Sequence, residues 1–178
     1  MQLHYKECSD IHIKQLVSLA KSTFIEAFQK DNNPKDFDNY IKSAFSEEQI
    51  LKELLNPNMF FYIVENAGIT IGYFKINQLN AQTELREEKG LEIERIYVLS
   101  AYQGRSIGHR MMTFIKQLAT KLKKEYIWLG VWEENTRAIR FYEHNGFKKF
   151  GRHPYYIGTD KQMDWLMRFD LPTLDQNL

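Results

Sequence analysis

Hydrophobic residues along the chain switch between the spacing typical of strands and the spacing typical of helices. Dense apolar runs predict strands over Leu91–Leu99 and Tyr126–Val131, because a strand covered on both faces has few polar positions. Between them, apolar residues recur about every 3.6 positions from Ile107 to Leu122 and predict a helix with one buried stripe. The centre of the chain is therefore predicted to be a strand, a tight loop, a helix and a second strand.

Breaks in the same pattern place the other elements. The hairpin among them must be antiparallel, whereas the central crossover joins parallel strands, so we expect an α/β fold with a mixed sheet and flanking helices. One domain over residues 1–170 and a frayed tail over residues 171–178 are expected. The predicted elements are a strand at Gln2–Lys6, a helix at Ser9–Phe28, short helices at Lys35–Ala44 and Glu47–Leu55, a hairpin of Met59–Glu65 with Ile69–Gln78, a polar loop at Asn80–Gly90, a short helix capped by Asn135, a strand that begins over Phe147–Phe150, and a closing strand at Asp164–Phe169.

Composition excludes several classes of protein. The net charge of +1 gives no basis for nucleic-acid binding, and no apolar run approaches the ~20 residues of a membrane span. The polar start MQLHYKECSD and the single cysteine, Cys8, lead us to expect a cytoplasmic protein with an inert thiol. The five histidines do not cluster with cysteines or carboxylates, so no metal site is expected.

The loop AYQGRSIG between the first central strand and its helix is a candidate anion site. The first N–H groups of a helix lack intrahelical partners, and with the helix dipole they attract a phosphate or pyrophosphate. Gly104 and Gly108 would let the backbone approach such a ligand, or they serve only a turn and a close packing contact. The loop lacks the Gly-Lys-Ser/Thr ending of a nucleoside-triphosphate loop and the third glycine of a dinucleotide fingerprint.

A second segment, KKEYIWLGVWEENTRAIRFYEHNGFKKF, decides between these interpretations. Strand, phosphate loop, helix, strand and capped helix in this order resemble the GNAT (GCN5-related N-acetyltransferase) superfamily, and the resemblance covers about residues 3 to 170. The family's loop motif, Gln/Arg-x-x-Gly-x-Gly/Ala, corresponds to Gln103–Gly108, with Ser106 at the first glycine. Its later motif is matched by Asn135, Ala138, Tyr142, Gly146 and Phe147.

The resemblance implies an enzyme that transfers an acetyl group from acetyl-CoA to an amine. It implies that a backbone N–H of Tyr97 or Val98 polarises the acetyl carbonyl, and that the Tyr142 hydroxyl protonates the departing thiolate. An aromatic side chain at position 142 is otherwise a core residue. The residues implied in cofactor binding are Ile96, Tyr97, Val98, Gln103, Gly104, Arg105, Ser106, Ile107, Gly108, His109, Asn135 and Tyr142.

Two carboxylates, Glu92 and Glu94, lie on one face of a strand that is otherwise apolar. A buried charge needs a partner or a water-filled cleft, so Glu94 either pairs with a lysine of a neighbouring element or takes part in the chemistry. The resemblance to polyamine acetyltransferases implies that Glu94 accepts the amine proton, through water or directly. Glu92 is interpreted as a charge on the substrate side.

Phrases such as LEIERIYV and IWLGVWE, with a leader rich in Phe, Asn and Glu, resemble the PaiA-type subgroup, which acetylates spermidine and spermine. Glu26 and Phe28 are the substrate-binding candidates in an acidic and aromatic stretch that extends to Glu48. Interleaved lysines leave open that this stretch is only a solvated face. Acetylation of a peptide amino terminus or of lysine, and a non-catalytic CoA-binding protein, are the alternatives. A homodimer is left open.

Overall fold

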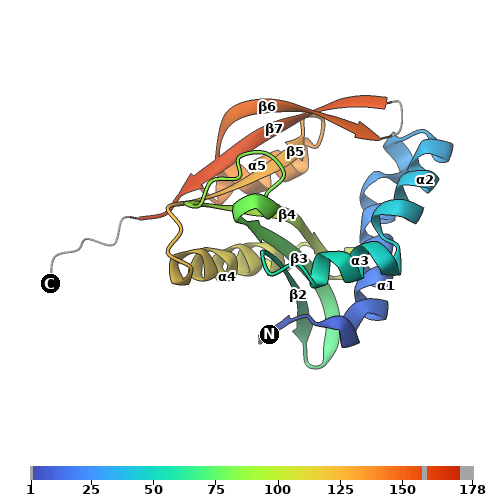
Figure 1. Ribbon diagram of the computed structural model, residues 1–178, viewed down its shortest axis with the longest axis horizontal. Coiled ribbons are helices and arrows are strands. Elements are labelled where there is room, and N and C mark those ends of the chain that lie inside the picture. Colours follow the sequence, from blue (N-terminus) through green and yellow to red (C-terminus); the bar gives the residue numbers. More distant parts are fainter. Residues whose placement is uncertain (1, 158–159, 173–178) are drawn as a thin grey trace, which may run out of the picture.

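A computed structural model describes residues 2–157 and 160–172 of the chain. Its described strands form one sheet with the order β1-β2-β3-β4-β5-β7-β6 (Figure 1). β4 and β5 run parallel, and the other neighbouring strands are antiparallel, which confirms the predicted mixed sheet. The strands are β1 (Leu3–Glu7), β2 (Met59–Asn66), β3 (Ile69–Gln78), β4 (Gly90–Val98), β5 (Tyr126–Trp132), β6 (Lys148–Ile157) and β7 (Asp160–Asp170).

Polar side chains cap the first turns of α2 (Pro34–Ala44) and α3 (Glu47–Leu54). The Asn33 side chain accepts hydrogen bonds from the N–H groups of Lys35 and Asp36, and Ser46 does the same for Gln49. The long helix predicted from Ser9 is instead a short 3-10 turn followed by an α-helix. The helical segments are η1 (Asp10–His12), α1 (Ile13–Phe28), η2 (Gln29–Asp31), α2 (Pro34–Ala44), α3 (Glu47–Leu54), η3 (Leu79–Ala81), η4 (Ser100–Tyr102), α4 (Ile107–Lys121) and α5 (Thr136–His144).

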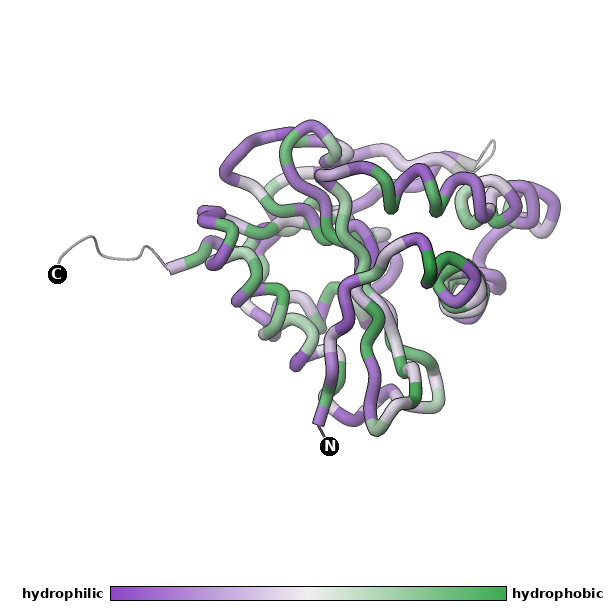
Figure 2. The backbone as a smooth tube through the Cα atoms, turned by 60° about the horizontal axis from the view of Figure 1, so that its bottom comes forward, coloured by the Kyte–Doolittle hydropathy of each residue, from purple (hydrophilic) through white to green (hydrophobic). Residues whose placement is uncertain are grey.

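Helices cover both faces of the sheet, with α1 to α3 on one face and α4 and α5 on the other. Leu16 and Phe24 of α1 share one hydrophobic cluster with Tyr73 of β3, whereas Met111 of α4 belongs to a second cluster with Leu129 of β5. Hydrophobic and hydrophilic positions alternate around the helices (Figure 2), as expected when one side of each helix is buried. No helix within the described ranges is long and apolar enough to cross a membrane.

The sheet opens between β4 and β5. These strands pair only from Gly90 and Tyr126 to Glu92 and Trp128; beyond that point β4 pairs with β3 alone, and β5 with β7 alone. The β3–β4 register shifts at Lys75, which leaves one extra residue in β4. The C-terminal half of β4 is therefore separated from β5 by a gap.

The end of the chain differs in part from its prediction. β6 and β7 form one long hairpin, although the sequence pattern predicted only its two outer ends. The predicted frayed tail lies outside the described residues from position 173 onward.

Candidate active site

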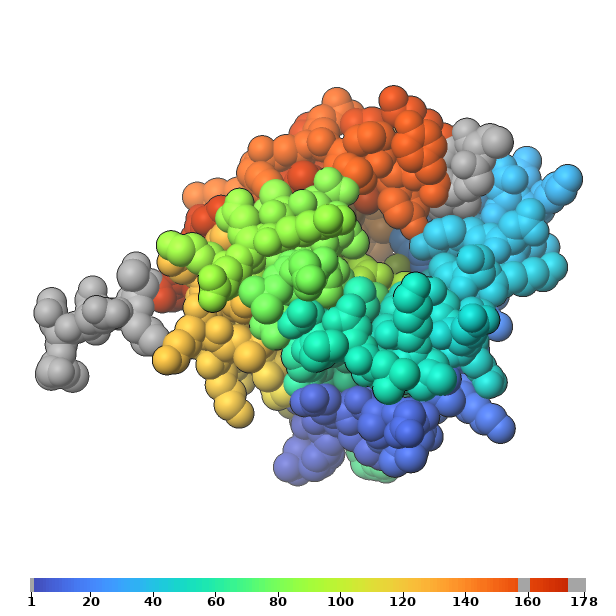
Figure 3. Space-filling model, in the orientation of Figure 1, coloured from blue at the N-terminus to red at the C-terminus, as the bar shows by residue number. Residues whose placement is uncertain are grey.

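A cavity of about 1160 Å³ runs through the gap between β4 and β5. At one end it is lined by the loop before α4 and by α5, and at the other by α1, α2, the segment of residues 79–90, β6 and β7. Figure 3 shows the hollow between the green segment of residues 79–90, the orange β6–β7 hairpin and the blue helices. We call these two parts the cofactor end and the acceptor end.

The cofactor end contains the start of α4. The Arg110 N–H donates to the Ser106 carbonyl over 3.1 Å, and it is the first N–H bonded within this helix. The N–H groups of Ile107, Gly108 and His109 precede it and have no intrahelical acceptor. All three residues line the cavity. This part of the chain therefore fits the pyrophosphate of acetyl-CoA.

The loop backbone explains the glycines of the motif. Gly104 has a φ of +75° and Ser106 a φ of +58°, both in the left-handed region. Glycine adopts this conformation without strain, so its preference at position 106 in the family has a steric cause. A Cβ at Gly108 would lie 3.2 Å from the Phe141 ring. Gly108 thus permits a close contact between α4 and α5, which is the packing interpretation of this glycine.

Three predicted cofactor residues make contacts that support the loop. The Gln103 side chain donates to the Val98 carbonyl and accepts from Arg137, both over 2.9 Å. His109 Nδ1 lies 2.8 Å from Asn145 Oδ1, which links α4 to α5. The Arg105 guanidinium lies over the Tyr102 ring and outside the lining of the cavity. Their contact with the cofactor stays a prediction.

Val98 directs both of its backbone polar groups into the gap. The Leu99 N–H donates to Ile71 of β3 over 2.9 Å, and groups two residues apart on a strand point the same way, so the Tyr97 N–H also faces β3. The Val98 N–H points the other way, like its carbonyl, which Gln103 reaches. Val98 is therefore the better placed of the two predicted donors to an acetyl carbonyl.

Tyr142 lies on α5 and lines the same cavity. Its ring packs 5.3 Å from the Phe141 ring and 5.9 Å from the Phe147 ring. Burial raises the pKa of Tyr142 above its usual range, and within the described residues its hydroxyl has no hydrogen-bond partner. The hydroxyl thus stays protonated and free to donate. Asn135 caps α5 by accepting from the Ala138 N–H and also lines the cavity, so its two predicted roles are compatible.

Glu94 belongs to a compact network of charges at the acceptor end. Its carboxylate lies 2.6 Å from Lys75 Nζ and 3.1 Å from Arg95 Nη2, and it accepts a hydrogen bond from Asn77. Burial by itself would raise the pKa of Glu94, but Arg95 and Lys75 outweigh burial and lower it to about 2. The sequence left open a pairing with a lysine of a neighbouring element, and the structure contains that pairing. The role of Glu94 as a base stays a prediction.

Glu92 connects the segment of residues 79–90 to the sheet. Its buried carboxylate accepts hydrogen bonds from Asn77 and from both the N–H and the hydroxyl of Thr83. Burial raises its pKa. In the same segment, the Gln82 side chain accepts from Trp128 Nε1 over 2.6 Å. This segment is polar and aperiodic, so no sequence signal indicated that it is an ordered wall of the site.

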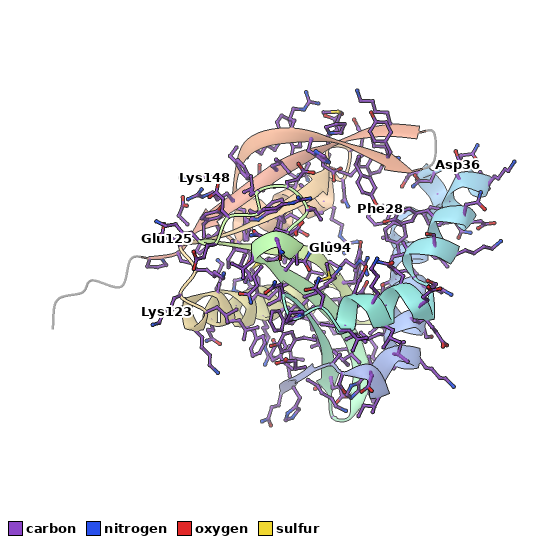
Figure 4. All side chains as sticks on the ribbon, viewed as in Figure 1. Phe28, Asp36, Glu94, Lys123, Glu125 and Lys148 are labelled. Atoms are coloured by element: carbon purple, nitrogen blue, oxygen red, sulfur yellow. The ribbon has the colours of Figure 1, made fainter. Side chains whose placement is uncertain are left out.

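The predicted acceptor residues are only partly brought together. Glu26 and Phe28 line the cavity, and Figure 4 shows Phe28 and Glu94 facing the same hollow, while Asp36 lies on the outer side of α2. The other acidic residues from Asp31 to Glu48 are not among the lining residues. Among the lining residues at this end that sequence reasoning missed are Glu84, Trp128, Trp132, His153, Tyr155 and Asp164.

Side chains that bind metals do not gather in the part of the chain that the structure describes: no three His, Cys, Asp or Glu residues there are placed to hold a metal ion. Cys8 lies outside the cavity, and burial raises the pKa of its thiol to about 12. A thiol with so high a pKa is a poor nucleophile.

Comparison with known proteins identifies the family. Residues 13–147 match the model of the acetyltransferase (GNAT) family. The chain is 33% identical over 162 residues to an uncharacterized N-acetyltransferase of Lactobacillus delbrueckii subsp. lactis, covering 91% of this chain and 94% of that protein. The chain therefore belongs to the GNAT family.

Solved structures share the fold. PaiA N-acetyltransferase from Thermoplasma acidophilum, in complex with coenzyme A, superposes with a TM-score of 0.77 at 19% identity, over 96% of this chain and 99% of that one. Spermidine N-acetyltransferase from Vibrio cholerae, in complex with CoA and spermine, superposes with a TM-score of 0.72 at 20% identity, over 96% of each chain. The protein is thus an N-acetyltransferase of the acyltransferase class, and acetyl-CoA is its co-substrate.

Proposed function

We propose that the protein acetylates a primary amine of a polyamine such as spermidine or spermine, as PaiA-type enzymes do. The observation that carries this proposal is the surplus of carboxylates at the acceptor end. A polycation binds best where acidic groups without cationic partners surround a partly dehydrated cleft.

The charges divide into a neutral network and an acidic remainder. Glu94, Arg95, Lys75 and the buried Glu53 form mutual ion pairs and balance one another. Outside this network, the described residues that line the acceptor end include four further carboxylates and one group that can be cationic, the His153 ring. The four carboxylates are those of Glu26, Glu84, Glu92 and Asp164.

The walls of the acceptor end favour a slender amine over a folded protein. Phe24, Phe28 and Trp128 supply aromatic faces, which attract ammonium groups. One side is closed, because the Tyr155 hydroxyl donates to the Tyr40 hydroxyl and so joins β6 to α2. A second bridge joins the start of β7 to the segment just before α2, where the Gln162 side chain donates to the Asn32 side chain over 3.0 Å.

The roles of the residues at the gap follow from their geometry. Acetyl-CoA supplies a thioester carbonyl and a thiolate leaving group. The Val98 N–H would donate to the carbonyl oxygen as negative charge develops on it. The Tyr142 hydroxyl would donate its proton to the departing sulfur. Glu94 would hold the ammonium group of the substrate, or water beside it, because its carboxylate stays ionised.

An acceptor panel tests this function. Purified protein with acetyl-CoA is given spermine, spermidine, putrescine, a monoamine and a short peptide, and free thiol release is followed. We expect kcat/KM to rise with acceptor charge and this preference to weaken with salt. Glu84→Gln should lower kcat/KM for spermine by about 2- to 5-fold and leave kcat/KM for the monoamine unchanged, a modest effect because water still reaches 34% of the Glu84 side chain.

The matched control is Glu47→Gln, an acidic residue in the first turn of α3 and outside the cavity. This variant should leave kcat/KM unchanged for both spermine and the monoamine. Preference for the peptide over every polyamine would replace this function with peptide acetylation, and binding of CoA without any acetylation would indicate a non-catalytic protein. A cytoplasmic location and a homodimer stay predictions.

A further inference from the structure

Asp164 of β7 occupies a special place beside the gap. In the sheet register it lies opposite Trp132 of β5 and opposite His153 of β6, and it lines the cavity. A Cβ built on Gly130 would be 3.3 Å from Asp164 Oδ2. The carboxylate therefore lies over Gly130, on the strand that borders the gap. Glycine is unfavourable inside a strand, and here its missing side chain makes room for this carboxylate.

The Asp164 carboxylate differs from the other carboxylates of the site in its partners. Glu94 has two cationic partners and an amide, and Glu92 accepts three hydrogen bonds. Within the described residues, Asp164 has neither a hydrogen bond nor an ion pair within contact distance. Its oxygen atoms are thus free to accept a proton or a hydrogen bond from a molecule in the cavity.

We propose that Asp164 accepts the proton of the acceptor ammonium group and so is the catalytic base. This inference rests on acetyl transfer to an amine and not on the identity of that amine. The N–H bond of the ammonium breaks and an O–H bond forms on Asp164, which leaves the nitrogen lone pair free to attack the thioester carbonyl. When the C–S bond breaks, the sulfur takes the proton of Tyr142, and the second proton from nitrogen restores the Tyr142 hydroxyl. Asp164 then releases its proton to water in the cavity.

The proton affinity of Asp164 suits this role. Burial raises the pKa of Asp164 to about 6, while His153 lowers it and Glu133 raises it. The pKa of Glu94 is about 2. The carboxylate of Asp164 therefore binds a proton more tightly than that of Glu94. A general base is most effective when its pKa is near the working pH.

The titratable groups that face Asp164 come from β6 and from the residue that follows β5. His153 of β6 is itself 3.1 Å from Glu84, so part of its charge is compensated when it is protonated. Glu133 follows β5 and is paired with Arg152 of β6. Tyr155 of β6 lies on the same side of the hairpin and feels the charge of Asp164. No lysine or arginine among the described residues pairs with Asp164 directly.

The test compares pH profiles of Asp164→Asn, Glu94→Gln and the parent, using the best acceptor of the panel with chemistry shown to be rate-limiting. In the parent we expect kcat/KM to fall in acid, with a limb near pH 6. Asp164→Asn should remove this limb, lower kcat by about 10²- to 10⁴-fold at pH 7, and recover towards pH 9 to 10, where more amine is already neutral. Glu94→Gln should keep the limb.

The matched control is Asp170→Asn, the same change at the exposed end of the same strand, where Asp170 pairs with Arg168. It should behave as the parent. Gly130→Ala is a second variant that keeps the carboxylate but crowds it, and it should lower kcat while acetyl-CoA still raises the melting temperature. The proposal is overturned if Asp164→Asn keeps both its kcat and the fall of kcat/KM near pH 6. It is also overturned if Glu94→Gln alone loses that fall. Acetylation of a peptide instead of a polyamine would contradict the proposed acceptor and leave this test valid.

Discussion

Replacement of Lys75 by methionine tests the charge network that holds Glu94. Lys75 is 1% exposed, and its ammonium lies 2.9 Å from Glu53 Oε2 and 2.6 Å from Glu94 Oε2. Methionine fills a similar volume without charge, so two carboxylates would share the single cation of Arg95, at 3.3 Å and 3.1 Å. Removal of one partner from a buried ion pair lowers the free energy of unfolding by about 3–5 kcal/mol. For a chain of this length, that corresponds to a melting temperature lower by about 6–20 °C.

The effect should depend on pH in a defined direction. The pKa of Glu94 is lowered from 4.5 to about 2. The ionised carboxylate therefore contributes to the free energy of unfolding above pH 4.5, and this contribution is lost as the pH falls towards 2. The contribution amounts to about 3 kcal/mol at neutral pH. In Lys75→Met the pKa of Glu94 rises, so the mutant should lose less stability than the parent between pH 4.5 and 2. Urea denaturation at several pH values measures both curves.

Two further variants make the result decisive. Lys89→Met removes an exposed lysine that pairs with Glu125, and it should leave the melting temperature nearly unchanged. Lys75→Met combined with Glu53→Gln restores the balance of one carboxylate and one cation, and it should recover part of the lost stability. A Lys75→Met protein that melts within about 2 °C of the parent at neutral pH would refute the reasoning.

The remaining predictions concern the cofactor end and Cys8. Tyr142→Phe keeps the ring and should leave the melting temperature and acetyl-CoA affinity nearly unchanged while kcat falls by about 10²-fold or more; an unchanged kcat with rate-limiting chemistry would make Tyr142 a core residue. Ser106→Gly relieves a left-handed backbone and should raise stability by up to about 1 kcal/mol in denaturation curves, whereas Ser106→Ala should not; equal effects would show that the backbone is unstrained. Cys8 should resist alkylation at pH 8 in the folded protein and react after unfolding, because burial raises its pKa to about 12; rapid labelling of the folded state, followed by mass spectrometry, would contradict this.

Local signals in the sequence were enough to predict the secondary structure of the cofactor end. The apolar strand, the loop with Gly104 and the amphipathic helix are neighbours along the chain, and their patterns predict their structures without distant partners. The caps at Asn33, Ser46 and Asn135 are equally local, since each bonds an N–H two or three residues away. The order of these motifs was sufficient to indicate the family.

The acceptor end depends on which distant residues meet, and this only the tertiary structure decided. The extra residue in β4 places Glu94 and Arg95 beside Lys75, and it was not visible as a pattern in either strand. β7 inserts between β5 and β6, which brings Asp164 over Gly130, 34 positions earlier in the chain. Ionisation follows burial and the nearest charges, so the pKa values of Glu94 and Asp164 diverge although both are carboxylates on strands. Periodicity reports only what a residue's neighbours along the chain allow, whereas these charges are governed by neighbours in space.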